Sequence, residues 1–371
     1  MKYTNNIIKN NKDKNIERIY FPELDGLRFF AFLLVFVHHH SLFSNINTNG
    51  WIGVDLFFVL SAFLLTKLLI AEYYKTQTIS FKKFYIRRIF RIWPIYFLFI
   101  GFSIALFLFS NGAPSNYIGM RIIGLFAFSD NIMTAIYGWN PLPYTAHLWT
   151  IAYEEQFYIF IPIIILFLVR SSFKTKVIYI ISIYILFNLI RLTLIANNAN
   201  STAIIGMLPI TRFESIFMGM VIGFNGFDFL LKKVKPLLLG LIGIFFFLLI
   251  YLFPLDNISY WIIAQYTFVG ISTSMILFSV LNSDFLKKIF SNQIFVFLGK
   301  RSYGLYVYHF LGNGVASYMI THISILPSNS FISFIYSLSF TVILSIISYK
   351  VVETPFLNLK KKFEVIISRP I

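Results

Sequence analysis

Apolar windows of about 20 residues recur along the whole of this 371-residue chain. A helix of about 20 apolar residues is the length that crosses the hydrocarbon core of a bilayer. The sequence therefore predicts an all-α, polytopic membrane helix bundle. A large soluble helical protein is the alternative, but 58% of the residues are hydrophobic and only 12% are charged, whereas soluble domains are roughly 25% charged. We place ten spans at 24–44, 51–71, 91–110, 151–170, 176–196, 207–225, 236–254, 260–281, 302–320 and 331–350.

A shorter apolar piece at 118–129 favours a re-entrant or interfacial segment over a full span. The orientation follows from the basic residues, because Lys and Arg are enriched in cytoplasmic loops. Of the 31 basic residues, 26 fall in the two tails and in alternate loops. Both termini are therefore expected in the cytoplasm, with the long loop 111–150 outside. The basic stretches are 1–20, 72–91, 170–176, 226–235, 282–301 and the segment from Lys350.

We divide the chain into a cytoplasmic N-terminal tail (1–20), a membrane domain (21–357) and a cytoplasmic C-terminal tail (358–371). The N-terminal stretch is too long and too polar for a signal-peptide n-region, so we expect it to be retained. The net charge of +16 is explained by topology and lipid headgroups, so no nucleic-acid partner is expected. The absence of cysteine excludes thiolate nucleophiles and disulfides. These features predict a multi-pass protein of the plasma (inner) membrane.

The first span opens with an arginine and closes with three histidines, in LRFFAFLLVFVHHH. Arg28 and His39 are eleven residues apart, so in a helix they share a face, about 16 Å apart along the axis. The neighbouring His38 and His40 are rotated away. A polar line on one face calls for a wet cavity or a bound ligand. The alternative is that the histidines only mark the interfacial end of a helix.

Other polar residues also fall at bilayer depth, where they are costly and tend to be functional. In FYIRRIFRIWPIY, the arginines Arg88 and Arg91 suit either a positive-inside anchor or a phosphate clamp. In AHLWTIAYEEQFYIFIP, Glu154 and Tyr158 share a helix face, and the carboxylate is either an interfacial cap or a functional group. The polar residues singled out by their depth are Arg28, the histidine triplet, Asp55, Glu154, Arg191, Arg212 and His309.

Seven blocks of this sequence, in order, resemble the acyltransferase-3 family of integral membrane O-acyltransferases. They cover roughly residues 22–357, and the family's ten-helix core agrees with the ten predicted spans. The blocks are LDGLRFFAFLLVFVHHH, GVDLFFVLSAFLLTK, FYIRRIFRIWPIY, HLWTIAYEEQFYIFIP, TRFESIFMGM, FLGKRSYGLYVYHF and ISYKVVETPF.

The resemblance implies roles for some residues. The family's arginine–histidine motif falls on Arg28 and His39, and its Arg-x-x-Arg motif, implicated in handling the acyl donor, falls on Arg88 and Arg91. A further block falls on Trp149, Glu154, Gln156, Phe157 and Tyr158. Recurring polar positions to which no role is assigned are Arg212, Tyr303, His309 and Glu353.

Two departures from the family pattern are visible. Ala62 replaces a glycine in Ser-Gly-Phe-Leu, where helices pack tightly. Some relatives also carry a C-terminal esterase-like domain, and this sequence ends about twenty residues after the last block. We therefore expect the chain either to finish the transfer itself or to pass the acyl group to a separate periplasmic or surface acceptor protein.

The expected activity is transfer of an acyl group, with acetyl expected, from a cytoplasmic acyl-CoA to a hydroxyl of a cell-surface carbohydrate such as a polysaccharide or lipopolysaccharide. We expect His39 to act as the base or as a transient acyl carrier. Arg28 would hold the thioester oxygen or a donor phosphate, and Arg88 and Arg91 the donor's phosphates. Glu154 would orient the site or bind the acceptor from outside. Acetyl-CoA is the expected co-substrate, and no metal is expected.

Two alternatives stay open at this point. The acceptor could instead be a lipid, a peptidoglycan sugar or a small hydroxylated metabolite. From another class of function, the same intramembrane charges suit a glycan or small-molecule transporter, although the internal repeats common in transporters are not visible.

Overall fold

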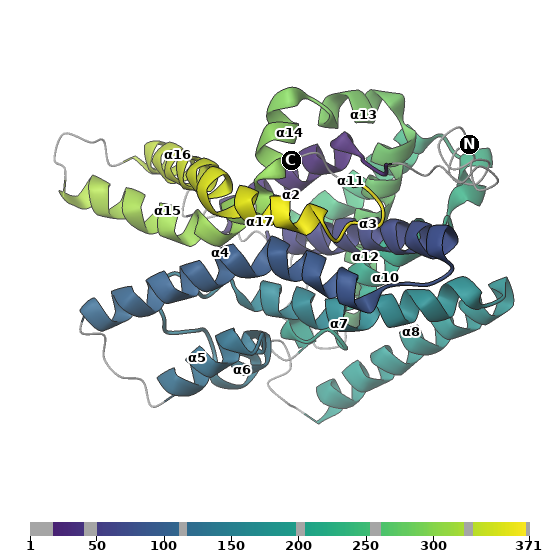
Figure 1. Cartoon of the computed structure of the whole chain (residues 1–371), viewed down its shortest axis with the longest axis horizontal. Helices are drawn as coiled ribbons and strands as arrows, with labels where there is room; N and C mark the ends of the chain where they lie inside the picture. The colour runs from purple at the N-terminus through teal and green to yellow at the C-terminus, as the bar shows by residue number, and fades with distance from the viewer. Residues whose placement is uncertain are drawn as a thin grey trace.

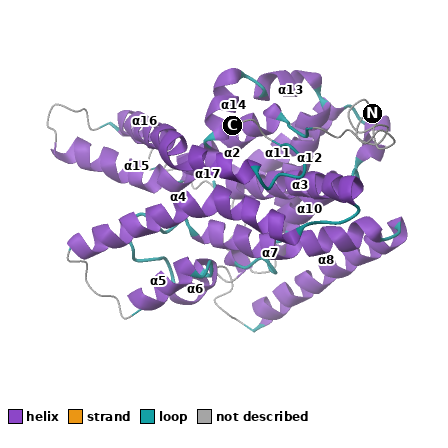
Figure 2. Ribbon diagram, viewed as in Figure 1, coloured by secondary structure: helices purple, strands orange, loops and turns teal. Residues whose placement is uncertain are grey.

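The computed structural model describes residues 18–40, 50–110, 117–197, 205–252, 261–322 and 329–368. Within these ranges the chain is helical, and the sole extended pairing is one isolated bridge between Arg18 and Ile367. Figure 2 shows helices joined by loops throughout. The all-α class is therefore confirmed. Six helices of the described residues are long and apolar enough to cross a membrane: Ile52–Thr76, Phe81–Phe109, Trp149–Arg170, Phe173–Ala196, Trp261–Asn282 and Ser330–Lys361.

Most helices coincide with the predicted spans to within a few residues (Figure 1). The elements are α2 (Pro22–His38), α3 (Ile52–Thr76), α4 (Phe81–Phe109), α5 (Ile118–Phe126), α6 (Asp130–Tyr137), α7 (Trp149–Arg170), α8 (Phe173–Ala196), α10 (Glu214–Gly223), η2 (Asp228–Lys232), α11 (Pro236–Leu252), α12 (Trp261–Asn282), α13 (Asp284–Phe290), α14 (Gln293–Lys300), α15 (Ser302–His322), α16 (Ser330–Ser348), η3 (Tyr349–Glu353) and α17 (Thr354–Lys361).

Three predicted boundaries differ from the structure. Helix α2 ends at His38, before the predicted end of the first span at 44, and positions 41–44 lie outside the described residues. The predicted span 207–225 contains a turn, and its main helix, α10, begins only at Glu214. Pro209 and the inward turn of Arg212 account for this, because proline interrupts a helix and Arg212 pairs with Asp55. In the third case α4 begins at Phe81, ten residues before the predicted span, so the arginine motif lies inside a helix. The short apolar piece at 118–129 forms α5, of nine residues.

Helix α3 lies at the centre of the bundle and packs against α2, α7, α10 and α12. Its contact with α10 depends on two glycines. A Cβ atom on Gly219 would overlap the carbonyl oxygen of Val59, and one on Gly223 would overlap Thr66. The close approach favoured by the G-x-x-x-G pattern is therefore present. Ala62 faces Gly219, so the missing methyl on α10 leaves space for the methyl that Ala62 adds to α3.

The outer helices keep apolar side chains exposed, as lipid-facing surfaces do. Figure 1 shows α8 at one edge of the bundle and α16 at the opposite end. Along α8 only Arg191 and Ile195 are buried. Arg191 forms an ion pair of 2.6 Å with Glu214 of α10, which fastens this otherwise apolar helix to the core. The two described ends of the chain meet, since the Ile19 N–H donates to the carbonyl oxygen of Ile367 at 2.9 Å.

Candidate active site

Two cavities lie inside the bundle and are separated by a thin wall. We call the first the basic cavity: its volume is about 140 Å³, and its charged lining residues are Asp25, Arg28, Arg88, Arg91, Glu154 and Lys360. We call the second the histidine cavity: its volume is about 740 Å³, and its polar and aromatic lining residues are His38, His39, Trp51, Trp139, His147, Trp149, Thr150, Arg212, Tyr266, Tyr306 and Phe310. Three residues, Val54, Thr150 and Tyr306, line both cavities.

Cations from three helices converge on the basic cavity. Arg28 comes from α2 and forms an ion pair of 3.1 Å with Asp25, one turn earlier. Arg88 comes from α4, and its guanidinium lies 5.7 Å from the centre of the Tyr158 ring. Lys360 comes from α17 and pairs with Glu364 at 3.1 Å. With Arg91 also in the lining, the cations outnumber the carboxylates, so the cavity favours an anionic ligand.

The two tyrosines predicted as site residues also line the basic cavity, together with Glu154. Tyr303 donates a hydrogen bond to the carbonyl oxygen of Ile92 at 2.8 Å, which ties α15 to α4. Glu154 is five residues further along α7 than Trp149 and lines the basic cavity instead of the cavity of His39. This position places the carboxylate among the arginines of the basic cavity.

Three imidazoles lie close together, and two of them, those of His39 and His147, line the histidine cavity. His39, directly after α2, is exposed where it lines the cavity. Its Nδ1 atom lies 3.1 Å from Nε2 of His309 on α15, and the ring centres of His309 and His147 are 4.5 Å apart. His147 is buried, and its burial together with the nearby His39 lowers its pKa to about 3. His147 is therefore a neutral imidazole at physiological pH.

Arg212 is held by an ion pair rather than left for a ligand. Its guanidinium pairs with Asp55 of α3, and Ser215 donates to the other oxygen of this carboxylate at 2.8 Å. The guanidinium also lies 4.5 Å from the ring centre of Trp51 and 5.3 Å from that of Tyr266. Both charged groups are almost fully buried. The predicted candidates Asp55 and Arg212 thus form one pair at the edge of the histidine cavity.

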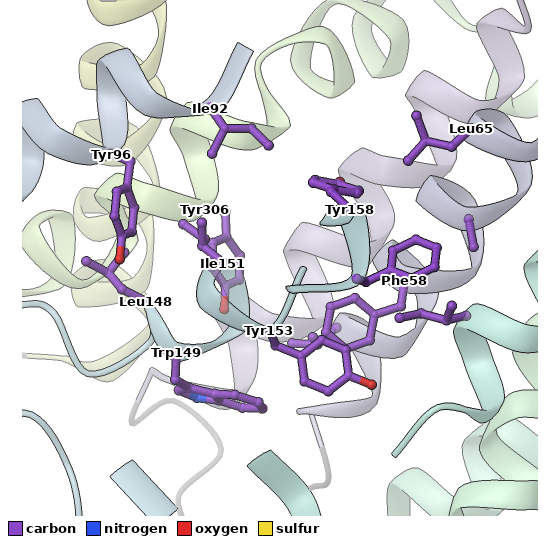
Figure 3. Close-up of a cluster of buried hydrophobic side chains, with 14 of the residues drawn as sticks. Phe58, Leu65, Ile92, Tyr96, Leu148, Trp149, Ile151, Tyr153, Tyr158 and Tyr306 are labelled. Carbon is purple, nitrogen blue, oxygen red and sulfur yellow. The ribbon is translucent and has the colours of Figure 1, made fainter. Parts of the chain in front are cut away.

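Two of the three residues that line both cavities, Thr150 and Tyr306, are in contact through their hydroxyl groups. The oxygens of Thr150 on α7 and Tyr306 on α15 are 2.7 Å apart. Thr150 donates to the carbonyl oxygen of His147 at 3.0 Å, and the Tyr306 hydroxyl lies 3.2 Å from the same oxygen. Figure 3 shows Tyr306 reaching α7 close to Ile151, the residue after Thr150. We call this pair the septum.

The predicted pair on α2 is divided by this septum. Arg28 lines the basic cavity and His39 lines the histidine cavity, so both face the interior of the bundle, as the shared face predicts. Sequence reasoning missed three residues of the site: His147, Tyr306 and Lys360. His147 and Tyr306 lie inside blocks that were noticed for other residues. Lys360 falls in the predicted C-terminal tail, and only the helix α17 reveals that it turns back onto the cavity.

The helical bundle of membrane type, with an interior cationic cavity beside an imidazole cluster, defines a membrane protein with a polar interior site. Comparison with known families identifies it further. Residues 21–350 match the acyltransferase-3 family, described as an acyltransferase domain. The chain belongs to this family, and the resemblance carried by the seven sequence blocks is confirmed.

Curated relatives come from Staphylococcus aureus. A protein named "Putative O-acetyltransferase" in strain COL is 33% identical over 360 residues, which are 91% of this chain and 57% of the relative. The O-acetyltransferase OatA of strain NCTC 8325 is 31% identical over 365 residues, which are 92% of this chain and 58% of that protein. The chain therefore spans less than two thirds of the length of these relatives. No solved structure matches the chain.

Proposed function

We propose that this chain is a membrane O-acetyltransferase that moves an acetyl group from cytoplasmic acetyl-CoA to a hydroxyl of a cell-surface carbohydrate. The observation that carries the proposal is the meeting of a cationic cavity and an imidazole-lined cavity at one septum, in a chain of the acyltransferase-3 family. The names of the relatives support acetyl as the acyl group. The acceptor class rests on the size and the aromatic lining of the histidine cavity.

The basic cavity is the proposed donor side. Guanidinium groups bind phosphate oxygens through paired hydrogen bonds, and Arg28, Arg88 and Arg91 all line this cavity. The Nε atom of Arg88 is buried and has no hydrogen-bond partner among the described residues. The cavity is smaller than most ligand pockets, which measure about 300–1,000 Å³. We therefore propose that only the acyl end of the donor enters it, while the nucleotide stays at the cationic mouth.

The histidine cavity is the proposed acceptor side. Its volume falls within the range of ligand pockets. Several aromatic rings line it, and an apolar ring face suits the C–H groups of a sugar. His39 lines the cavity, and we propose that it removes the proton from the acceptor hydroxyl.

The proposed reaction takes place across the septum. The acceptor oxygen forms a bond to the acetyl carbon as His39 takes its proton. Negative charge develops on the carbonyl oxygen and is stabilised by the hydroxyl of Tyr306, which acts as a positioned donor. The carbon–sulfur bond then breaks, and the thiolate of CoA receives the proton from His39. A transient acetyl group on His39 is the alternative route.

The proposed topology places the basic cavity on the cytoplasmic side. Its lining includes Tyr20 and Ser368, which lie near the two described ends of the chain. The pairing of Ile19 with Ile367 supports termini on one side of the membrane. The histidine cavity is lined by Trp139 and Gly206, which belong to loops without a basic excess. We propose ten spans in the plasma membrane, with α2, α10, α11 and α15 completing the six longer apolar helices. The domain limits at 20 and 357 are part of this proposal.

The test uses purified full-length protein in lipid vesicles, with labelled acetyl-CoA and surface glycans isolated from deletion cells. Label should appear on the glycan as an alkali-labile ester. His39→Ala should lower the rate by about 10²–10⁴-fold, the usual contribution of a general base. His322→Ala, an exposed histidine at the end of α15, is the matched control and should retain wild-type activity.

Each failure has a distinct meaning. Retained transfer in His39→Ala removes His39 from the reaction. Label on a lipid or a small metabolite reassigns the acceptor, and label on an added surface protein indicates a relay to a separate carrier. Glycan that crosses the vesicle membrane without acetylation would favour a transporter.

A further inference from the structure

Hydrogen bonds around His309 determine which of its ring nitrogens carries the proton. Its Nδ1 atom lies 2.5 Å from the carbonyl oxygen of Tyr306, three residues earlier on α15. A carbonyl oxygen only accepts hydrogen bonds, so Nδ1 must carry a proton. His309 is fully buried, and aromatic rings of Phe32 and Phe310 contact it. A neutral imidazole suits such a position, because burying a charge is costly.

The tautomer of His309 determines the tautomer of His39. A neutral imidazole has one N–H group, so the Nε2 atom of His309 is an acceptor. The atom that faces it, at 3.1 Å, is Nδ1 of His39. For this contact to be a hydrogen bond, Nδ1 of His39 must carry the proton. The lone pair of His39 is then on Nε2.

We propose that His309 is a positioning residue that holds His39 in its Nδ1–H form, so that Nε2 is the base. This inference rests on the proposed role of His39. When Nε2 takes the proton of the acceptor hydroxyl, Nδ1–H keeps donating to His309, and the neutral His309 stabilises the imidazolium. His39 then returns the proton from Nε2 to the departing thiolate, so no net proton is gained or lost by the pair.

One turn of α15 carries both His309, which contacts the base His39, and Tyr306, which belongs to the septum. Tyr306 presents its carbonyl oxygen to His309 and its hydroxyl to Thr150. The ring of His309 cannot rotate without losing its bond to this carbonyl. The spacing of three residues between Tyr306 and His309 therefore positions the oxyanion donor directly and the base, His39, through its contact with His309.

The kinetic test compares two substitutions at this position. His309→Leu removes the acceptor, and kcat should fall by about 10²–10⁴-fold, with the KM for acetyl-CoA unchanged. His309→Gln places an amide oxygen near the former Nε2 atom, and it should retain at least about tenfold more activity than His309→Leu. A merely structural role predicts equal losses in both variants. Size-exclusion profiles and thermal unfolding in detergent establish that each variant is folded.

The spectroscopic test reads the tautomer directly. Protein with ¹³C,¹⁵N-labelled histidine is studied in lipid bilayers by solid-state NMR, and the signal of His39 is assigned by its loss in His39→Ala. The wild type should show the Nδ1–H form, and His309→Leu should shift the signal to the Nε2–H form. An Nε2–H form in the wild type would overturn the inference.

The results also separate this inference from the function on which it rests. If His39→Ala is active, the proposed role of His39 fails, and the inference fails with it. If His39→Ala is inactive but His309→Leu has the wild-type kcat, only the positioning role fails.

Discussion

The basic cavity and the histidine cavity use their polar groups differently. Both contain arginine, but Arg212 in the histidine cavity is paired with the carboxylate of Asp55, whereas Arg88 in the basic cavity forms no ion pair with a carboxylate of the described residues. The basic cavity is small and lined by cations, and the histidine cavity is about 740 Å³ and lined largely by rings. A cation that is paired with a carboxylate maintains the fold, and a cation without such a partner is available to an anionic ligand. The two cavities are thus suited to different halves of one transfer.

Arg212 offers the largest expected effect, because its removal leaves the Asp55 carboxylate buried and uncompensated. Arg212→Ala should lower the free energy of unfolding by about 3–5 kcal/mol, measured by thermal and denaturant unfolding in detergent. The control is the double variant Asp55→Leu with Arg212→Leu, which removes both charges and should be more stable than Arg212→Ala. A stable Arg212→Ala with a raised KM for the acceptor would instead make Arg212 a ligand-binding residue.

Tyr306 tests whether the two cavities meet at a reacting centre. Tyr306→Phe removes the hydroxyl of the septum but keeps the ring, and kcat should fall by about 10²-fold, as it does when one oxyanion donor is removed. Tyr318→Phe, an exposed tyrosine of the same helix, is the control. An unchanged kcat would mean that the septum is only a partition.

Arg88 tests the donor side of the comparison. Hydrogen bonds to charged groups contribute about 1.5–3 kcal/mol, so Arg88→Ala should raise the KM for acetyl-CoA by about ten- to a hundredfold. Arg88→Lys keeps the charge but loses the planar fork, and it should restore only part of the affinity. Lys82→Ala, at an exposed position of α4, should leave the KM unchanged. A fall in kcat without a change in KM would contradict a binding role.

Local patterns were sufficient for most of the fold. Apolar windows are set by the bilayer, so their positions predicted nearly every long helix. The start of the span at 207–225 was wrong because hydropathy averages over the turn that Arg212 makes toward Asp55, a partner 157 residues away in sequence. The short helices α13, α14 and α17 were missed because they are too short or too polar to give a membrane signal.

The candidate site was predictable only where one helix carries the information. The shared face of Arg28 and His39 follows from the helical repeat. The contact between His39 and His309 joins residues 270 positions apart. The helical repeat relates only residues within one helix, so it could not predict this contact. The location of Glu154 among the arginines also depends on how α7 packs against α3 and α4. Tertiary packing therefore decided which polar residues meet.

Trp139 gives the smallest expected effect and tests the acceptor side. Its side chain is 62% exposed, although it lines the histidine cavity, so it stands at the mouth and not in the core. Stacking on an aromatic ring contributes about 1 kcal/mol, so Trp139→Ala should raise the KM for the glycan acceptor by about fivefold. The KM for acetyl-CoA should not change, because no residue of the basic cavity is altered.

Trp139→Phe should keep most of the acceptor affinity, since it preserves a ring face. The control is Trp261→Ala, because Trp261 is similarly exposed, at 54%, but does not line the cavity. Equal effects of Trp139→Ala on donor and acceptor would mean that the loop disturbs the whole fold. An acceptor KM like that of the wild type would place the sugar elsewhere in the cavity, away from its mouth.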